Sequence, residues 1–200
     1  MAIARDKALG IIQARGGTIR TSDAIAQGIH PRTLYGLRDS GELERLDRGI
    51  YRLAHLPPLG DPDIALVAGR VPQAVLCLVS ALAVHGLTTQ IPHSVHIALP
   101  RGTRPPRLSS VPITAYQFSE RSYQAGVQRY SFDGGGIPIF SPEKTIADCF
   151  KYRNKLGLDL TLEALANYRR RKKASLATIL KFAEVNRVAK PIRPYLEAVR

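Results

Sequence analysis

Residues 29–53, IHPRTLYGLRDSGELERLDRGIYRL, combine cationic, hydroxyl and aromatic side chains at spacings suited to nucleic-acid binding. Guanidinium groups form paired hydrogen bonds with guanine or with phosphate, and hydroxyl groups donate to phosphate oxygens. The helix predicted at the start of this stretch contributes Arg32, Thr33, Tyr35 and Arg38. The strand-like passage that follows contributes Arg45, Arg48 and Arg52. We therefore predict that these side chains contact double-stranded DNA.

A helix and a hairpin must position these side chains. His30 can cap the helix, and Pro31 occupies the first helical position, where its missing N–H costs nothing. Leu34 and Leu37 share one face, so the basic residues lie elsewhere on the circumference. A turn sequence at residues 47–49 then divides two strands. A helix followed by a basic-tipped hairpin is typical of a winged helix-turn-helix, whose helix enters the major groove.

The residues before this stretch favour the same class of fold. An amphipathic helix is predicted over residues 4–15, and a short extended piece over residues 18–20. Thr21 or Ser22 then caps a second short helix. The order helix, strand, helix, helix and hairpin is typical of winged helices. Each single element is common, but this order of elements is not.

Other interpretations of the same residues stay open. Helix-turn-helix folds also serve as protein-binding modules, and Arg32 and Arg38 could be ordinary solvated residues. Tyr35 could donate to phosphate or pack against a neighbour. His30 fits a helix cap better than a base-reading residue. We favour DNA binding because basic residues recur on both the helix and the hairpin.

The remainder of the chain predicts a second domain. A proline-rich stretch over residues 55–62 separates the two parts. We therefore predict an α+β protein, with a winged helix-turn-helix over residues 1–55 and a mixed α/β domain ending in helices over residues 62–200. Strands are predicted over residues 95–99, 111–118, 126–132 and 137–140, the second and third as antiparallel neighbours. A glycine-rich turn is predicted over residues 133–136.

Helices in this second part are predicted from their capping residues. Asp61 precedes Pro62 and a helix over residues 62–71, and Ser141 precedes a helix that ends near Gly157. Further caps are predicted at Ser80, Thr161 and Ser175. The apolar stretch 73–79 is either a buried strand or the start of a helix. Two prolines, at 191 and 194, should bracket the last helix.

Charge is distributed unevenly along the chain. The net charge is +13, and residues 137–200 carry 14 basic and six acidic residues, a net charge of +8. Such a chain favours polyanions or acidic protein surfaces. A continuous basic run comprises Arg169, Arg170, Arg171, Lys172 and Lys173. It could contact phosphate or an acidic partner, or it could be a solvated cationic helix end.

No catalytic pattern emerges from the sequence, so we expect neither enzymatic activity nor a cofactor or metal. Cys77 and Cys149 lie singly in apolar stretches, and His93 and His96 would face opposite sides of a strand. His85 is expected near a helix end without a catalytic role. No apolar stretch approaches the ~20 residues that cross a bilayer, and the N-terminus is no secretory signal. We expect a cytoplasmic protein with reduced cysteines.

Several segments together resemble one known family. They are LERLDRGIYRL, ALAVHGL, VHIALPRG and IPIFSPEKTIADCFKYRNKLGLD. Over essentially the whole chain they are similar to the AbiEi-type antitoxins and transcriptional regulators of abortive-infection, type IV toxin–antitoxin systems, which act in phage defence. The RGIY hairpin and SPEKTIADCF are the most recognisable parts.

The resemblance implies an N-terminal winged helix that binds inverted repeats in its own promoter and represses it. It also implies a C-terminal domain tied to antitoxicity and, in some members, to DNA contact. The functional partner would be a nucleotidyltransferase-type toxin, without a stable complex, and the protein would act as a monomer or as cooperating copies on DNA. The alternative is a protein- or RNA-interaction module that uses the basic C-terminal part.

Overall fold

The computed structural model describes residues 2–56, 61–108, 110–132 and 135–198. Two compact units are present, Met1–Pro72 with Tyr130–Ile137, and Gln73–Arg129 with Pro138–Arg200. The two domains predicted from the sequence, residues 1–55 and 62–200, stay a prediction. The compact units differ from them in that residues 62–72 group with the N-terminal elements.

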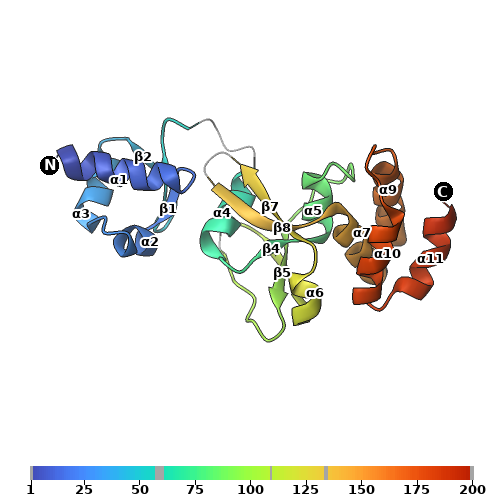
Figure 1. The fold of residues 1–200 in the computed structure, drawn as a ribbon. Coiled ribbons are helices and arrows are strands. Elements are labelled where there is room, and N and C mark those ends of the chain that lie inside the picture. Colours follow the sequence, from blue (N-terminus) through green and yellow to red (C-terminus); the bar gives the residue numbers. More distant parts are fainter. Residues whose placement is uncertain (1, 57–60, 109, 133–134, 199–200) are drawn as a thin grey trace. The chain divides into compact units, whose positions relative to one another are not determined.

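The first unit contains helices and strands in the predicted order (Figure 1). These elements are α1 (Ala2–Ala14), β1 (Thr18–Arg20), α2 (Thr21–Ala26), α3 (Pro31–Asp39), β2 (Leu43–Asp47) and β3 (Ile50–Leu53), and α4 (Pro62–Arg70) follows them. The three strands form an antiparallel sheet in the order β1-β3-β2, with a bulge between Arg45 and Asp47. Ile12, Leu34 and Leu37 are among the side chains that form its apolar core. This core holds α1 and α3 against the sheet.

The second unit is built on a mixed sheet, two of whose strands include residues of the Tyr130–Ile137 segment that groups with the first unit. Its strands are β4 (Val75–Leu76), β5 (Val95–Pro100), β6 (Ile113–Phe118), β7 (Val127–Phe132) and β8 (Gly135–Phe140), in the order β6-β5-β4-β8-β7. Strands β5 and β6 are parallel over their full length, whereas β4 and β5 are antiparallel. The prediction that residues 111–118 and 126–132 are antiparallel neighbours was therefore wrong. They form opposite edges of the sheet, because the first of them pairs with β5.

Helices complete the second unit. They are α5 (Leu78–Val84), α6 (Glu120–Gln124), α7 (Pro142–Lys151), α8 (Arg153–Leu156), α9 (Leu158–Arg169), α10 (Leu176–Val185) and α11 (Ala189–Ala198). Figure 1 shows α9, α10 and α11 together at the C-terminal end of the chain. Helix α7 lies at the centre of a large apolar core, to which Ile146, Cys149 and Phe150 contribute as predicted. Part of the predicted turn at 133–136 lies outside the described residues.

Three predicted helix starts were wrong. Helix α2 begins at Thr21 after Arg20, and no side chain caps it. Helix α5 begins at Leu78, so Ser80 lies inside it. The Ser80 hydroxyl accepts a hydrogen bond from the His96 backbone N–H at 2.9 Å, which ties α5 to β5. Helix α9 likewise begins three residues before Thr161, which is buried.

The last helix also differs from its prediction. Helix α11 contains both Pro191 and Pro194 instead of lying between them. Pro191 is tolerated in the first turn, where a helix leaves N–H groups unpaired. The predicted caps at His30, Asp61, Ser141 and Ser175 are confirmed, since each side chain accepts a backbone N–H of its helix.

Candidate nucleic-acid interface

Helix α3 has one buried and one solvent-facing side. Leu34 and Leu37 are at most 1% exposed, which fixes the rotation of the helix against the core. The imidazole Nδ1 of His30 accepts the backbone N–H of Arg32 at 3.1 Å, and it thereby fixes the start of the helix. His30 is thus a cap, as predicted. Arg32 is exposed, and the side chain of Thr33 is half-buried.

Tyr35 and Arg38 form a stacked pair on the exposed side of α3. The guanidinium of Arg38 lies over the Tyr35 ring, 5.2 Å from its centroid. The same ring meets Tyr51 of β3 edge-on, with centroids 6.4 Å apart. Arg38 also forms an ion pair of 2.7 Å with Asp39, whose hydrogen bond raises the pKa of Arg38. The Tyr35 ring therefore packs between α3 and the sheet, although 39% of the residue remains exposed.

Gly36 lies on the same exposed side, in the middle of α3. A side chain there would meet nothing within 4 Å, so the fold does not require a glycine. Glycine in a helix interior costs ~0.5–1 kcal/mol relative to alanine. The residue therefore leaves open space on this surface at some cost in helix stability.

An open groove of about 890 Å³ runs beside α3. It lies between the start of α1 and the exposed side of α3. Its lining residues are Ala4, Arg5, His30, Pro31, Arg32, Thr33, Tyr35, Gly36, Leu37 and Asp39. The structure thus brings Arg32, Thr33 and Tyr35 to one concave surface, which Arg38 adjoins through its stacking on Tyr35.

The β2–β3 hairpin presents two of its three predicted arginines to solvent. Arg45 and Arg48 are exposed. Arg45 Nε donates to the backbone oxygen of Asp47 at 3.3 Å. The Asp47 carboxylate accepts the Arg48 backbone N–H at 2.7 Å and closes the turn. Asp47 therefore binds the side chain of Arg45 and the backbone of Arg48 at the turn of the hairpin.

The third arginine of the hairpin lies elsewhere. Arg52 is only 2% exposed, and its guanidinium forms an ion pair of 2.8 Å with Glu44. Residue 52 belongs to the central strand of the sheet, where Thr18 and Glu44 face it from the two neighbouring strands. Its burial does not suit the DNA contact that we predicted. The basic sequence of the hairpin alone did not indicate which strand would be central.

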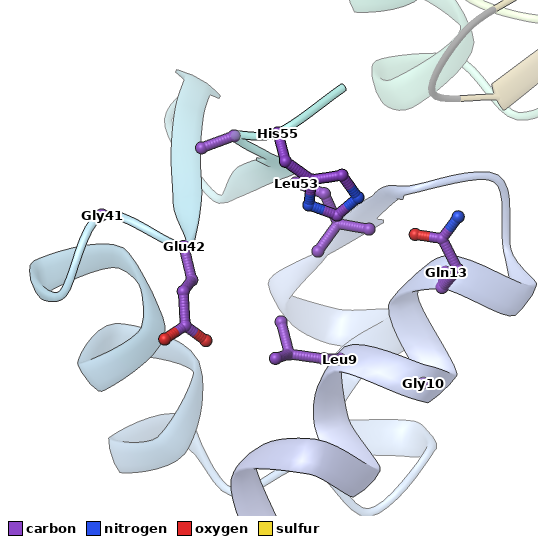
Figure 2. Close-up of a pocket in the computed structure, with 8 residues that line it drawn as sticks. Leu9, Gly10, Gln13, Gly41, Glu42, Leu53 and His55 are labelled. Carbon is purple, nitrogen blue, oxygen red and sulfur yellow. The ribbon is translucent and has the colours of Figure 1, made fainter. Parts of the chain in front are cut away.

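A second pocket in the first unit lies away from the predicted residues (Figure 2). It has a volume of about 440 Å³, and Figure 2 shows the side chains of Leu9 and Leu53 directed toward it. Its other lining residues are Gly10, Gln13, Gly41, Glu42, Ala54 and His55. The Glu42 carboxylate is already bound by Arg5. The surface of the pocket is therefore largely apolar, and the one carboxylate among these lining residues, that of Glu42, is paired with Arg5.

The basic run of the second unit is exposed at the end of α9. Arg169, Arg170, Arg171, Lys172 and Lys173 are all exposed. The guanidinium of Arg171 nevertheless donates to the backbone oxygen of His85. Farther back along α9, Asn167 donates to the backbone oxygen of Leu87 at 3.1 Å. Arg171 therefore helps α9 to hold the segment after α5, which sequence reasoning did not anticipate.

An unexpected ion pair lies in the core of the second unit. Lys144 and Asp148 of α7 are 0% exposed, and the Lys144 ammonium lies 2.5 and 2.6 Å from the two carboxylate oxygens. Asn186 donates to the same carboxylate at 2.6 Å and accepts from the Ser122 hydroxyl at 2.9 Å. Burial lowers the pKa of Lys144 and raises that of Asp148. The sequence signal was the four-residue spacing between Lys144 and Asp148, which places them on the same side of the helix as each other.

Glu143 on the same helix has a separate role. Its carboxylate accepts the Tyr168 hydroxyl at 2.6 Å, and that hydroxyl accepts the Ser175 backbone N–H at 2.9 Å. Burial alone would raise the pKa of Glu143, but hydrogen bonds, first that of Tyr168, lower it. Burial and the bond to Glu143 raise the pKa of Tyr168 to about 12. The three residues join α7, α9 and α10.

Within the described ranges, no group of three or more histidine, cysteine or acidic side chains could hold a metal ion. Cys77 and Cys149 are buried and unbridged. Across the part of the chain that the structure describes, none of the helices combines the length and apolar character needed to traverse a bilayer.

Comparison with known proteins identifies the N-terminal elements. Residues 9–54 match the family described as transcriptional regulator, AbiEi antitoxin. This match runs from the second half of α1 to the end of β3, and it confirms the family resemblance for that segment. No curated protein matches the chain.

One solved structure similar to this chain is the crystal structure of the RV2827C protein from Mycobacterium tuberculosis. The two chains are 15% identical, with a TM-score of 0.47, over 96% of this chain and 80% of the other.

Proposed function

We propose that this protein is a DNA-binding transcriptional repressor and antitoxin, whose first unit acts as a winged helix-turn-helix. Helix α3 would enter the major groove, and the β2–β3 hairpin would be the wing on the phosphate backbone. The observation that carries the proposal is the exposure of Arg32 on α3 together with Arg45 and Arg48 on the hairpin. All three lie within the segment that matches the regulator family.

The finer functional assignments follow from the family resemblance. We propose that the protein binds inverted repeats in its own promoter and so represses its operon. Its functional partner would be a nucleotidyltransferase-type toxin of a type IV system, which it would counter without a stable complex. The antitoxin would act in the cytoplasm, as a monomer in solution and as cooperating copies on DNA. We propose no catalytic activity or cofactor.

Fluorescence anisotropy tests the DNA-binding proposal. The purified protein is titrated onto its own upstream DNA and onto a scrambled duplex of equal length, across a salt series. Site-selective binding that persists at physiological salt is the expected result. Equal affinity for both duplexes, lost together as salt rises, would contradict sequence-specific binding, because counterion release alone gives that behaviour.

The basic run of the second unit favours a second candidate function, contact with nucleic acid or an acidic protein through this unit. Arg171 of this run is bonded to the backbone oxygen of His85. The other four side chains are exposed, namely Arg169, Arg170, Lys172 and Lys173. If the run contacts DNA phosphates, replacing these four by glutamine should lower the salt slope of DNA binding. An unchanged slope would assign the run to a different partner or to solvent.

Arg171→Gln is the separate control for that experiment. It removes the same charge as one of the four substitutions but also breaks the bond to His85. A loss of thermal stability confined to Arg171→Gln would separate the structural arginine from its neighbours.

A further inference from the structure

The end of helix α4 meets all three strands of the first sheet. This helix lies beyond the segment that matches the regulator family, which ends at residue 54. Its last three residues each make a different contact. Arg20 of β1 reaches the backbone oxygen of Ala68 at 3.5 Å. Gly69 lies so close to β3 that an added Cβ would be 2.9 Å from Cδ1 of Ile50.

The third contact is an ion pair with the end of β2. Arg70 Nε and Nη2 donate to one oxygen of the Asp47 carboxylate at 3.0 and 2.7 Å. The second oxygen of that carboxylate accepts the Arg48 backbone N–H. The side chains of Arg70 and Asp47 are 31% and 27% exposed, so the pair is partly shielded from water. One carboxylate thus connects the end of α4 to the turn of the hairpin.

This connection affects the charge of the hairpin tip as well as its shape. Asp47 is an acidic residue between Arg45 and Arg48, and an unpaired carboxylate there would repel phosphate. The guanidinium of Arg70 offsets this charge. In addition, the backbone oxygen of Asp47 accepts Arg45 Nε, so the position of Asp47 also affects that side chain.

We propose that Arg70 is a positioning residue for DNA binding, which acts through Asp47 to hold the hairpin turn and to neutralise its acidic group. The proposal rests on the proposed function, because it assigns the hairpin to the phosphate backbone. It extends the DNA-binding element from residue 54 to α4. A protein truncated at the end of β3 would lack this support.

A double-mutant cycle tests whether Arg70 acts through Asp47. Binding to the upstream duplex is measured at fixed salt for Arg70→Ala, Asp47→Asn and the double variant. Arg70→Ala should weaken binding about fivefold, because it leaves a free carboxylate at the tip. In the Asp47→Asn background, the same substitution should change binding less than about twofold. An equal loss in both backgrounds would mean that Arg70 contacts DNA itself, and would overturn the proposal.

Arg15→Ala is the matched control for charge. Arg15 is exposed, and its side chain forms a 3.9 Å ion pair with Asp23 of α2 instead of with Asp47 of the hairpin. If Arg15→Ala lowers the affinity for DNA as much as Arg70→Ala does, the loss is explained by net charge alone, and the proposal is overturned.

Hydrogen exchange of the free protein provides a measurement without DNA. Peptides covering residues 43–53 should exchange faster in Arg70→Ala than in wild type, with no change in Arg15→Ala. Unchanged exchange in Arg70→Ala would show that the Arg70–Asp47 ion pair does not hold the turn, and would overturn the proposal. If exchange responds as expected but the wild type does not select its upstream duplex, the proposed function has failed. The role of the ion pair in holding the turn would then still stand.

Discussion

The two units use neighbouring acidic and basic side chains in opposite ways. In the first unit, Arg38 and Asp39 pair at the surface of α3, beside an open groove. In the second unit, Lys144 and Asp148 pair inside a core that excludes solvent from both. A surface pair is worth little to stability and can exchange partners, whereas a buried pair is costly to break. Burial therefore separates the proposed binding element from a structural one.

The largest expected effect comes from breaking the buried pair. Lys144→Met should reduce the free energy of unfolding by ~3–5 kcal/mol, because it leaves the Asp148 carboxylate buried without a counter-charge. Denaturant unfolding measures the loss. The double variant Lys144→Met with Asp148→Leu should recover most of it. A Lys144→Met protein as stable as wild type would show that the pair is not the structural element described here.

The surface pair should behave in the opposite way. Arg38→Ala should leave the free energy of unfolding nearly unchanged, because exposed ion pairs contribute little. It should weaken DNA binding by ~1–3 kcal/mol if Arg38 reads a base, and by less if it holds a phosphate. Anisotropy titration and denaturant unfolding of the same sample separate the two effects. A binding curve that coincides with the wild-type curve would remove Arg38 from the interface.

Gly36 sharpens the comparison because stability and binding should change in opposite directions. Gly36→Ala should stabilise the protein by ~0.5–1 kcal/mol, as expected for an exposed helix position. It should also weaken DNA binding, if DNA approaches α3 closely at that point. Gly10→Ala is the matched control, since Gly10 is also an exposed helical glycine with nothing within 4 Å of its Cβ position. Equal binding by both variants would contradict a close approach at Gly36.

The smallest expected effect is a pH dependence at the hairpin turn. The hydrogen bond from Arg70 is the main reason why the pKa of Asp47 is lowered. A carboxylate with a lowered pKa contributes stability above its unfolded pKa of ~3.9, and this contribution is lost as pH falls through the folded value. The difference in unfolding free energy between wild type and Asp47→Asn should therefore shrink at acid pH. A difference independent of pH would show that the carboxylate charge does not matter there.

Local patterns in the sequence predicted much of the first unit. The helix caps at His30 and Asp61 were predictable because a capping side chain acts on its own backbone within three residues. The turn at residues 47–49 was predictable because it too depends on neighbouring residues, with the Asp47 carboxylate accepting the backbone N–H of Arg48. The strand order of the second unit was not, because the pairing of β5 with β6 joins residues far apart in the chain. Periodicity indicates a strand but does not select its partner.

In the candidate interface, too, local features were predictable from the sequence, whereas contacts between separate elements were not. The sequence by itself determined which residues carry cations or hydroxyl groups, and which side of α3 they occupy, because Leu34 and Leu37 define the opposite side. Only the tertiary structure decided that Arg52 is buried against Glu44, that Arg171 is bonded to His85, and that Arg70 reaches Asp47. These contacts join separate elements, and charge alone does not reveal whether a guanidinium meets solvent or a neighbouring strand.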